Sequence, residues 1–535
     1  MLRRHELALA FDESQKGRFK REYFSDYKIP TVPHVRWQHK PLPISPATRT
    51  EVSKMFLDKI KNGTYEPSQS LYSSRWFVVF KKNGKFRIVH DLQPLNGVTI
   101  RDASVPPNID EFVESFAGRA CYSVLDVFSG YDQRTLHPDS RDLTSFMTPD
   151  RGAYRLTSLP QGFTNSVRVF QNDMTYTLGS MIPDKAGVFV DDCGLKGGKT
   201  RYELADGSYE TMPGHPQVRR FIYEHLNDVD EVLTRIIYAG ITVAAAKLQI
   251  AALEATIVGH RVSYEGRHPD DAKIQKVLDF PVPLDTTQLR GFLGLMEVVR
   301  IFIKGFAAVA RPLTALLKKE NEWEWNDRCQ RAFEELKERA IKAPCLAPID
   351  YTCGGEVILA VESSWIAVGF ILMQKNSKGK RVPARYGAIT FNDRESRYSQ
   401  PKFELYGLFR ALESFSHFLF GPSEFMVEVD AKYIKRMLNS PEAVPNTTTN
   451  RQIEGILRFP IKLRHIPAKD HSGPDALSRR RRVSEDGVDD DSDEEREREE
   501  ERPRLADENY EEADDLYDVE CIVLVESTSG SPVDR

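Results

Sequence analysis

Cysteine is scarce in this chain of 535 residues, which has only six of them and no CxxC spacing. This scarcity excludes a disulfide scaffold and a zinc site built on paired cysteines, and it favours a reducing, intracellular setting, either cytoplasmic or nuclear. Long apolar runs are also missing, so we expect no membrane-spanning helix and no membrane partner. The basic N-terminus is followed only by the short apolar run LALAF, which makes a poor signal peptide.

Net charge is also small, at −5, but it is unevenly distributed. Residues 483–535 contain 22 Asp and Glu against 5 Arg, a net of −17, so residues 1–482 carry the difference, +12. The acidic tail has the composition of a disordered segment. The basic body fits a polyanionic partner such as nucleic acid, the alternative being a basic surface that only keeps the protein in solution.

The first hundred residues contain two recognisable local patterns. Residues 1–50 are punctuated by proline and are expected to form an extended arm. Residues 76–92, WFVVFKKNGKFRIVHDL, read as two apolar strands around Asn83 and Gly84. Asn-Gly between apolar strands is the strongest short-range signal for a β-hairpin, so we predict one here.

Helical periodicity appears further along the chain. Residues 285–319 have apolar residues at helical spacing after a start that resembles a capping box, and Pro312 is expected to divide the segment. Another helix is predicted over 326–340. A break rich in proline and glycine at 342–356 then marks a domain boundary, after which strands resume at 357–361.

Carboxylates end two apolar strands in the first half of the chain. In AGVFVDDCGLKG, residues 186–197, the apolar run 188–190 reads as a buried strand and is followed by Asp191 and Asp192. A hairpin turn would explain this pair alone. However, Asp126 ends a similar strand, and three carboxylates that meet at one point can hold the two divalent cations that nucleotidyl transfer requires.

Two other stretches supply groups suited to a nucleotide. The hairpin carries Lys81, Lys82 and Arg87, which are cations of the kind that hold a triphosphate. Within LTSLPQGFTNSVRVFQNDM, residues 156–174, a loop opens a helix and places the Gln161 amide where it can face a nucleotide. An ordinary helix start is the alternative for this second stretch.

Taken in order, FKKNGKFRIVHDLQPLN, VLDVFSGY, LPQGFTNS and VFVDD resemble the motifs of a reverse transcriptase, in particular that of gypsy-type long-terminal-repeat retrotransposons. The stretch 257–295 is similar to the primer grip and thumb of that family. FEELKERAIKAPCLAPID and FELYGLFRALESFSHFLFG are similar to the passage into its RNase H domain. The resemblance covers about residues 12–480 and is ordered throughout.

The resemblance implies a role for each matched residue in the polymerase. Three acids would bind two Mg²⁺ ions, with Mn²⁺ as an alternative ion: Asp126, Asp191 and Asp192. Four residues would contact the incoming deoxynucleoside triphosphate: Lys81, Arg87, Tyr131 and Gln161. The length of the hairpin leaves open whether Lys81 or Lys82 takes this role. Tyr131 stands at the steric-gate position, which rejects the ribose 2′-hydroxyl.

A second set of acids resembles the Asp-Glu-Asp-Asp site of RNase H, which also uses two metal ions. Its members are Glu362, Glu404, Asp430 and Asp475. Glu404 shares a predicted helix face with apolar residues, where a charge is unexpected. Singly, the other three would be ordinary acids at strand ends or caps. Glu362 departs from the family, which has Asp there, and its extra methylene displaces the carboxylate.

These observations predict an α+β multidomain fold: a polymerase right hand of fingers, palm and thumb, followed by an α/β RNase H-like domain and a disordered acidic tail. The expected divisions are an arm (1–50), fingers and palm (51–255), thumb and connection (256–345), RNase H-like domain (354–480) and tail (481–535). The predicted function is RNA-directed DNA synthesis with degradation of RNA in RNA–DNA hybrids. Expected partners are an RNA template, a DNA primer, RNA–DNA hybrid and deoxynucleoside triphosphates. The alternative is a catalytically decayed relic that only binds nucleic acid.

Overall fold

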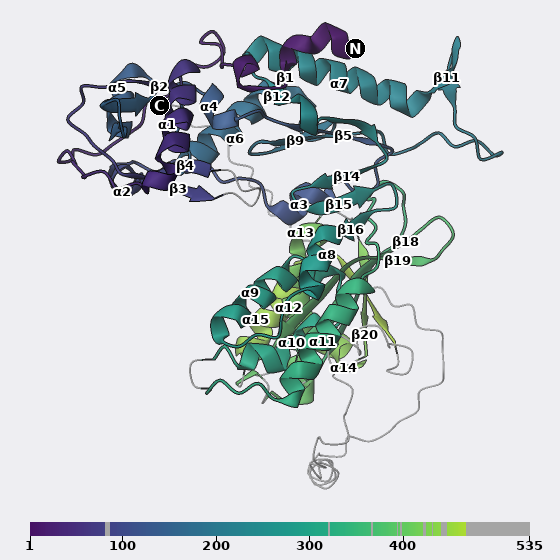
Figure 1. The fold of residues 1–535 in the computed structure, drawn as a ribbon. Coiled ribbons are helices and arrows are strands. Elements are labelled where there is room, and N and C mark those ends of the chain that lie inside the picture. Colours follow the sequence, from purple (N-terminus) through teal and green to yellow (C-terminus); the bar gives the residue numbers. More distant parts are fainter. Residues whose placement is uncertain are drawn as a thin grey trace, which may run out of the picture. The chain divides into compact units, whose positions relative to one another are not determined.

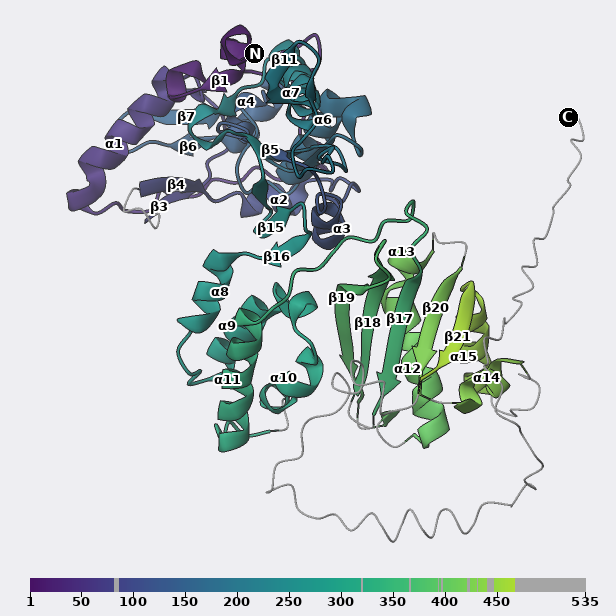
Figure 2. The same cartoon turned by 90° about the vertical axis from the view of Figure 1, so that its right-hand side faces the viewer.

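The computed structural model describes residues 1–80, 86–318, 321–364, 367–392, 394–395, 398–420, 424–430, 432–439 and 447–466. Lys81, Lys82, the Asn-Gly turn, Asp475 and the acidic tail lie outside these residues. The chain divides into two compact units, Met1–Arg267 and His268–Arg535 (Figures 1 and 2). None of the described helices is long and apolar enough to cross a membrane.

A four-stranded antiparallel sheet forms the centre of the first unit, in the order β13-β5-β9-β8. Its strands are β5 (Tyr122–Asp126), β8 (Ala186–Phe189), β9 (Asp192–Lys196) and β13 (Gln249–Ala252). Helices α6 (Ser166–Leu178) and α7 (Arg220–Ala239) cover one face (Figure 1). α7 ends where Gly240 adopts a φ of 78°, a left-handed conformation that suits glycine. The opposite face approaches Phe116 so closely that a Cβ on Gly194 would lie 2.5 Å from its ring.

A separate apolar cluster packs around Phe56 and Trp76. It joins α1 (Pro46–Lys61), the sheet β2-β7-β6 and the strands β3 (Trp76–Phe80) and β4 (Phe86–His90). The bounds of the sheet strands are Tyr65–Pro67, Ala153–Leu156 and Phe146–Met147 in that order. β3 and β4 pair antiparallel from Trp76↔His90 to Phe80↔Phe86, which confirms the predicted strand pair.

Short elements complete the first unit. They are η1 (Leu2–Ala8), β1 (Leu9–Ala10), η2 (Glu13–Gln15), α2 (Gln93–Val98), α3 (Ile109–Glu114), α4 (Gly130–Gln133), α5 (Pro138–Arg141), β10 (Thr211–Met212), β11 (His215–Arg219), β12 (Val243–Ala244), β14 (Glu254–Ile257) and β15 (His260–Ser263). The N-terminal β1 pairs with β12, from Leu9↔Val243 to Ala10↔Ala244. The arm therefore adds a strand to this unit.

The second unit begins with helices packed around one apolar cluster: α8 (Asp271–Leu278), α9 (Thr286–Glu297), α10 (Phe306–Ala315) and α11 (Asp327–Ile341). α9 and α11 confirm the predicted helices. The prediction that Pro312 divides the first of these segments is wrong, because Pro312 lies inside α10 and the break falls at 298–305. Proline removes one backbone donor, and the buried Val309 and Leu313 on either side hold the helix together.

A five-stranded mixed sheet follows, in the order β19-β18-β17-β20-β21 (Figure 2). The strands are β17 (Val357–Ser363), β18 (Ala367–Lys375), β19 (Arg381–Thr390), β20 (Phe425–Val429) and β21 (Ile461–His465). The helices of this part are α12 (Gln400–Ser414), α13 (Ser416–Leu419), α14 (Lys432–Asn439) and α15 (Thr447–Leu457). α12 packs on β17 and β18. Every residue of β17 is buried, as expected for a central strand with both faces covered.

Candidate polymerase and nuclease sites

Three of the predicted carboxylates lie at one end of the central sheet. Asp126 on β5 stands directly opposite Asp192 on β9 in the antiparallel register. Asp191 occupies the two-residue turn between β8 and β9, and its carbonyl accepts a 3.1 Å hydrogen bond from the backbone of Val127. Strand register therefore brings together residues that are separated by 65 positions or more in the sequence.

The turn itself differs from the prediction that residues 188–190 are all strand. Val190 lies in the turn with a φ of 58°, a conformation that a β-branched residue rarely adopts. The side chain of Gln171 on α6 holds the turn: its Oε1 accepts from the Val190 amide at 2.7 Å, and its Nε2 donates to the Val188 carbonyl at 3.0 Å. Sequence reasoning missed Gln171, although a polar residue next to Phe170 on an apolar helix face was a signal.

A lysine accompanies the acids. Lys247 donates from Nζ to Asp126 Oδ2 at 2.7 Å. Burial raises the pKa of Asp192, with Asp191 and Asp126 adding to the rise and Lys247 opposing it. Sequence reasoning missed Lys247 as well, although it is the only charge within the apolar stretch ITVAAAKLQIAA.

Carboxylate oxygens are the ligands that Mg²⁺ prefers, so the donor set at Asp126, Asp191 and Asp192 fits this ion. Burial is the main cause of the raised pKa of Asp192 and the nearby carboxylates of Asp191 and Asp126 add to it, so a cation among these acids would favour their charged forms. The type of donor thus fits Mg²⁺, but in the described part of the chain no three Asp, Glu, His or Cys side chains are gathered as they would be around a bound metal ion. The ammonium of Lys247 supplies the positive charge at Asp126 instead.

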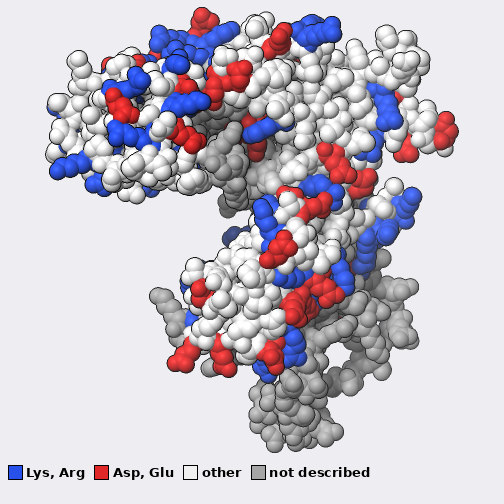
Figure 3. All heavy atoms as spheres, in the orientation of Figure 1, with Lys and Arg blue, Asp and Glu red and all other residues white. Residues whose placement is uncertain are grey.

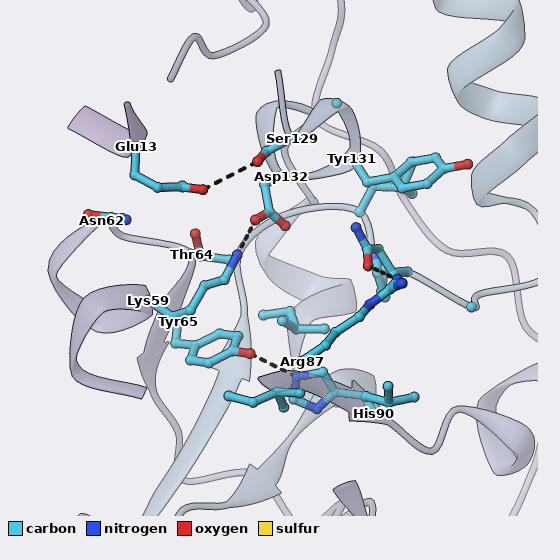
Figure 4. Close-up of a pocket in the computed structure, with 18 of the residues that line it drawn as sticks. Glu13, Lys59, Asn62, Thr64, Tyr65, Arg87, His90, Ser129, Tyr131 and Asp132 are labelled. Carbon is cyan, nitrogen blue, oxygen red and sulfur yellow. Dashed lines mark hydrogen bonds and ion pairs between the residues drawn. The ribbon is translucent and has the colours of Figure 1, made fainter. Parts of the chain in front are cut away.

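A cavity of about 900 Å³ opens beside these acids (Figure 4). Five of the predicted residues line it, namely Arg87, Asp126, Tyr131, Gln161 and Asp191, and so does Lys247. The Arg87 guanidinium donates a hydrogen bond to Gln161 Oε1. The prediction that these two residues face one nucleotide pocket is thus consistent with their positions. On the face drawn in Figure 3, Lys and Arg are interspersed with Asp and Glu.

Tyr131 stands within this cavity on a fully buried aromatic support. Its ring meets that of Phe170 edge to face, with centroids 5.3 Å apart and an angle of 67° between the planes. Burial, with a smaller contribution from Asp191, raises the pKa of Tyr131 to about 12. The hydroxyl is therefore neutral at physiological pH, and the ring can act as an uncharged wall.

Further polar pairs line the opposite side of the cavity (Figure 4). Lys59 on α1 forms an ion pair with Asp132, and the Tyr65 hydroxyl lies 3.0 Å from His90 Nε2. Burial lowers the pKa of His90 to about 4, so this imidazole is neutral at physiological pH. The first pair connects α1 to the loop that carries Tyr131, and the second connects β2 to β4.

A buried histidine contacts β5, the strand that ends in Asp126. His225 Nε2 on α7 lies 2.7 Å from the Ser123 hydroxyl on β5, and burial lowers the pKa of His225 to about 4. An unfolded histidine titrates near pH 6.5, so the unfolded state binds a proton that the folded state excludes as the pH falls from about 6.5 to about 4. Acid should therefore lower the free energy of unfolding of this unit.

The free energy of unfolding should fall between pH 7 and pH 5 in both proteins. We expect this fall to be about 2 kcal/mol smaller in the His225→Gln variant than in the wild type. Gln retains a polar group toward Ser123 but does not titrate. The free energy of unfolding from urea denaturation of the full chain at both pH values checks this. An identical pH dependence in the two proteins would contradict the assignment of a neutral His225.

Three of the acids predicted for the RNase H site come from different elements of the second unit. Glu362 lies on β17 and is 1% exposed, Glu404 lies on α12 and is 7% exposed, and Asp430 follows β20 directly. β17 and β20 are parallel, and the pair Val361↔Val429 places the next residues, Glu362 and Asp430, side by side. The burial of Glu404 confirms that this charge lies on an apolar helix face.

Two polar residues, Gln400 and Tyr433, lie close to these acids. Gln400 Nε2 donates to Glu404 Oε1 at 3.1 Å. The pKa of Tyr433 is raised by burial and then by Glu404 and Asp430, so both carboxylates lie near its hydroxyl. The structure thus brings three of the four predicted nuclease acids to one end of the sheet, and the fourth, Asp475, lies outside the described residues.

Fold and sites together define the class: a polymerase-like unit with paired carboxylates, followed by an RNase H-like unit. Residues 79–262 match the family of reverse transcriptases (RNA-dependent DNA polymerases), and residues 325–427 match the RNase H-like domain found in reverse transcriptases. The chain belongs to the reverse transcriptases of long-terminal-repeat retrotransposons that carry an RNase H domain.

Relatives of known identity are transposon proteins. The chain is 29% identical over 440 residues to the retrovirus-related Pol polyprotein from transposon 412 of Drosophila melanogaster, covering 81% of this chain and 33% of that protein. It is 28% identical over 446 residues to the Pol polyprotein from transposon 297 of the same fly, covering 82% and 39%. The Tf2-3 polyprotein of Schizosaccharomyces pombe is 24% identical over 438 residues, covering 82% and 31%. The chain therefore spans about a third of the length of these relatives.

Solved structures share the fold. The foamy viral protease-reverse transcriptase in complex with double-stranded DNA superimposes with a TM-score of 0.74 at 21% identity, covering 87% of this chain and 77% of that one. The same enzyme in complex with RNA/DNA hybrid gives a TM-score of 0.70 at 19% identity, covering 95% and 62%. The mixed α/β fold of a retroviral reverse transcriptase is thus the fold of this chain.

Proposed function

We propose that this chain is an RNA-directed DNA polymerase that extends a DNA primer on an RNA template with deoxynucleoside triphosphates. The observation that carries the proposal is the single cavity lined by Asp126, Asp191, Arg87, Gln161 and Tyr131. It combines carboxylates for metal ions, a cation for the triphosphate and an aromatic wall for the sugar. The relatives, which are Pol polyproteins of transposons, support the same activity.

In the proposed mechanism, Asp126, Asp191 and Asp192 would hold two Mg²⁺ ions, whose positive charge would stabilise the negative charge that develops during phosphoryl transfer. Arg87 pairs with the triphosphate, and Gln161 orients the Arg87 guanidinium through their hydrogen bond. The Gln171 amide fixes the turn that carries Asp191. Lys247, which pairs with Asp126 in this structure, would yield that position to a bound metal ion.

The proposed right-hand architecture gives each part of the chain a role in DNA synthesis or RNA cleavage. The proposed fingers and palm comprise residues 51–255, which contain all residues of the cavity except Glu13. Residues 256–345 are proposed as thumb and connection, on the basis of their helical packing. Residues 354–480 are proposed as the RNase H-like domain, in which Glu362, Glu404, Asp430 and Asp475 would hold two metal ions that supply the chemistry for hydrolysis of the RNA strand of a hybrid.

Primer extension on an RNA template tests the proposal. Purified protein with Mg²⁺ and all four deoxynucleoside triphosphates is expected to extend an annealed DNA primer, and chelation with EDTA is expected to stop it. A protein that binds the primer–template at low salt without extending it with either Mg²⁺ or Mn²⁺ would be the decayed, binding-only relic. That outcome would contradict the polymerase assignment.

Tyr131 is expected to set the choice of sugar. The Tyr131→Ala variant removes the ring that walls the cavity, so discrimination for deoxyribonucleotides over ribonucleotides should fall on the order of tenfold to a hundredfold. The ratio of kcat/KM for dCTP and CTP on one primer–template measures it. A ratio equal to that of the wild type would mean that the ring only fills space.

A further inference from the structure

The N-terminal segment 13–24 runs through the first unit directly behind the proposed nucleotide cavity. Its backbone is held at three consecutive residues: Arg18 donates to the carbonyl of Gly240 at 2.9 Å, Phe19 to that of Gln133 at 3.0 Å, and Lys20 to that of Ala239 at 2.9 Å. These bonds tie the segment to the end of α7 and to the residues that follow Tyr131.

Gly17 shows how tightly the segment is wedged. A Cβ at this position would lie 2.6 Å from both Gln133 Oε1 and the Gly240 carbonyl, closer than real Cβ contacts come. The Gly17 amide also donates to Thr242 Oγ1 at 2.8 Å. The segment is therefore a fixed part of the unit, and small changes in it are transmitted to its neighbours.

An aromatic row links this segment to the proposed sugar gate. Phe19 is 2% exposed, and its ring stacks on Phe170 with centroids 5.9 Å apart and planes at 18°. The other neighbour of Phe170 is Tyr131, edge to face at 5.3 Å. Gly130 closes the gap, because a Cβ on it would lie 2.6 Å from Phe170 Cζ. Phe170 is thus held between Phe19 and the loop that carries Tyr131.

Polar side-chain contacts also hold the loop, to Thr242 at one end and to segment 13–24 at the other. The Gln133 side chain is fully buried, donates to the carbonyl of Thr242 at 2.9 Å and accepts from the Thr242 amide at 2.9 Å. At the other end of the loop, the Ser129 hydroxyl donates to Glu13 Oε1 at 3.4 Å (Figure 4). Glu13 and Phe19 thus contact the loop on both sides of Tyr131.

We propose that Phe19 is a positioning residue that sets the place of Tyr131, and with it the selection of the nucleotide sugar. The inference rests on the proposed polymerase function. Without the Phe19 ring, Phe170 relaxes into the vacated space, and Tyr131 follows it away from the cavity. Even a small shift of the Tyr131 ring should alter the discrimination between deoxyribonucleotides and ribonucleotides, because misplacement of a group by about 1 Å can change rates about a hundredfold.

The test compares discrimination between dCTP and CTP in four proteins on one RNA template with a DNA primer. They are the wild type, Phe19→Leu, Tyr131→Ala and the matched control Phe221→Leu. Phe221 is 1% exposed and packs on Tyr209 in a different apolar cluster of the same unit. Like Phe19→Leu, the Phe221→Leu substitution removes a buried ring from this unit and should lower its free energy of unfolding, but it leaves Phe19, Phe170 and Tyr131 unchanged.

We expect Phe19→Leu to lower the ratio of kcat/KM for dCTP over CTP about fivefold, with Tyr131→Ala lowering it more and Phe221→Leu leaving it unchanged. Because both constants scale with the amount of active protein, the ratio is independent of the folded fraction. Phe19→Met, which keeps most of the volume, provides a second variant and should shift the ratio in the same direction.

An unchanged ratio in both Phe19 variants, together with a fall in Tyr131→Ala, would overturn the inference and leave the polymerase assignment intact. An equal fall in Phe221→Leu would overturn it as well, because the sugar selection would then respond to any core substitution in this unit and not to the contact between Phe19 and Phe170. If the wild type does not extend the primer, the proposed function itself has failed, and the inference fails with it.

Discussion

Replacing Asp191 by asparagine is expected to lower RNA-templated DNA synthesis at least about a thousandfold. The substitution preserves volume and removes one of the three negative charges that are proposed to hold the metal ions. Asp191 is exposed in the turn between β8 and β9, and the hydrogen bond from Val127 goes to its backbone carbonyl, so the turn does not depend on the carboxylate. The loss should therefore appear in the reaction rate and not in folding.

Single-turnover extension of a labelled primer measures this loss. A separate titration with the primer–template shows whether the variant still binds nucleic acid. Asp184→Asn is the matched control, because Asp184 is an exposed acid at the opposite end of β8. It should retain wild-type synthesis. If Asp191→Asn also retains it, the carboxylates at this turn are not the metal ligands, and the polymerase site must be sought elsewhere.

Shortening Glu362 to aspartate is expected to raise cleavage of an RNA–DNA hybrid, by up to about a hundredfold. β17 pairs with β18 in unbroken register from Val357 to Ser363, so no bulge draws the backbone back to offset the longer side chain. The Glu362 carboxylate therefore extends one methylene beyond the place that an aspartate would occupy. Asp restores the shorter reach that metal-ion spacing requires.

Cleavage of a labelled RNA strand in the hybrid measures this gain, with DNA synthesis by the same preparations as an internal reference. Synthesis should not change, because Glu362 belongs to the other unit. Glu404→Gln should abolish cleavage. A fall in cleavage on Glu362→Asp would show that the site is adapted to the longer acid, and equal cleavage in the wild type, Glu362→Asp and Glu404→Gln would show that these acids are not a nuclease site.

Local patterns predicted much of the fold. The β3–β4 pair, α9, α11 and β17 lie where the sequence indicated. Each depends on the period of apolar residues, on a cap or on proline and glycine at an end, all of which act within a few positions. The sequence also indicated that Asp126, Asp191 and Asp192 could meet at one point, whereas the register of β5 and β9 is what places Asp126 opposite Asp192.

Several features were decided by tertiary structure alone. Pro312 lies inside α10 because the packing around Val309 and Leu313 outweighs one missing donor, and Val190 adopts a strained turn because Gln171 binds it from another element. Lys247 meets Asp126 across 121 positions of sequence. Such contacts arise only when distant elements dock, and no local pattern encodes them. The sequence by itself therefore determined the class of protein and its acids, whereas the docked structure determined what surrounds and positions those acids.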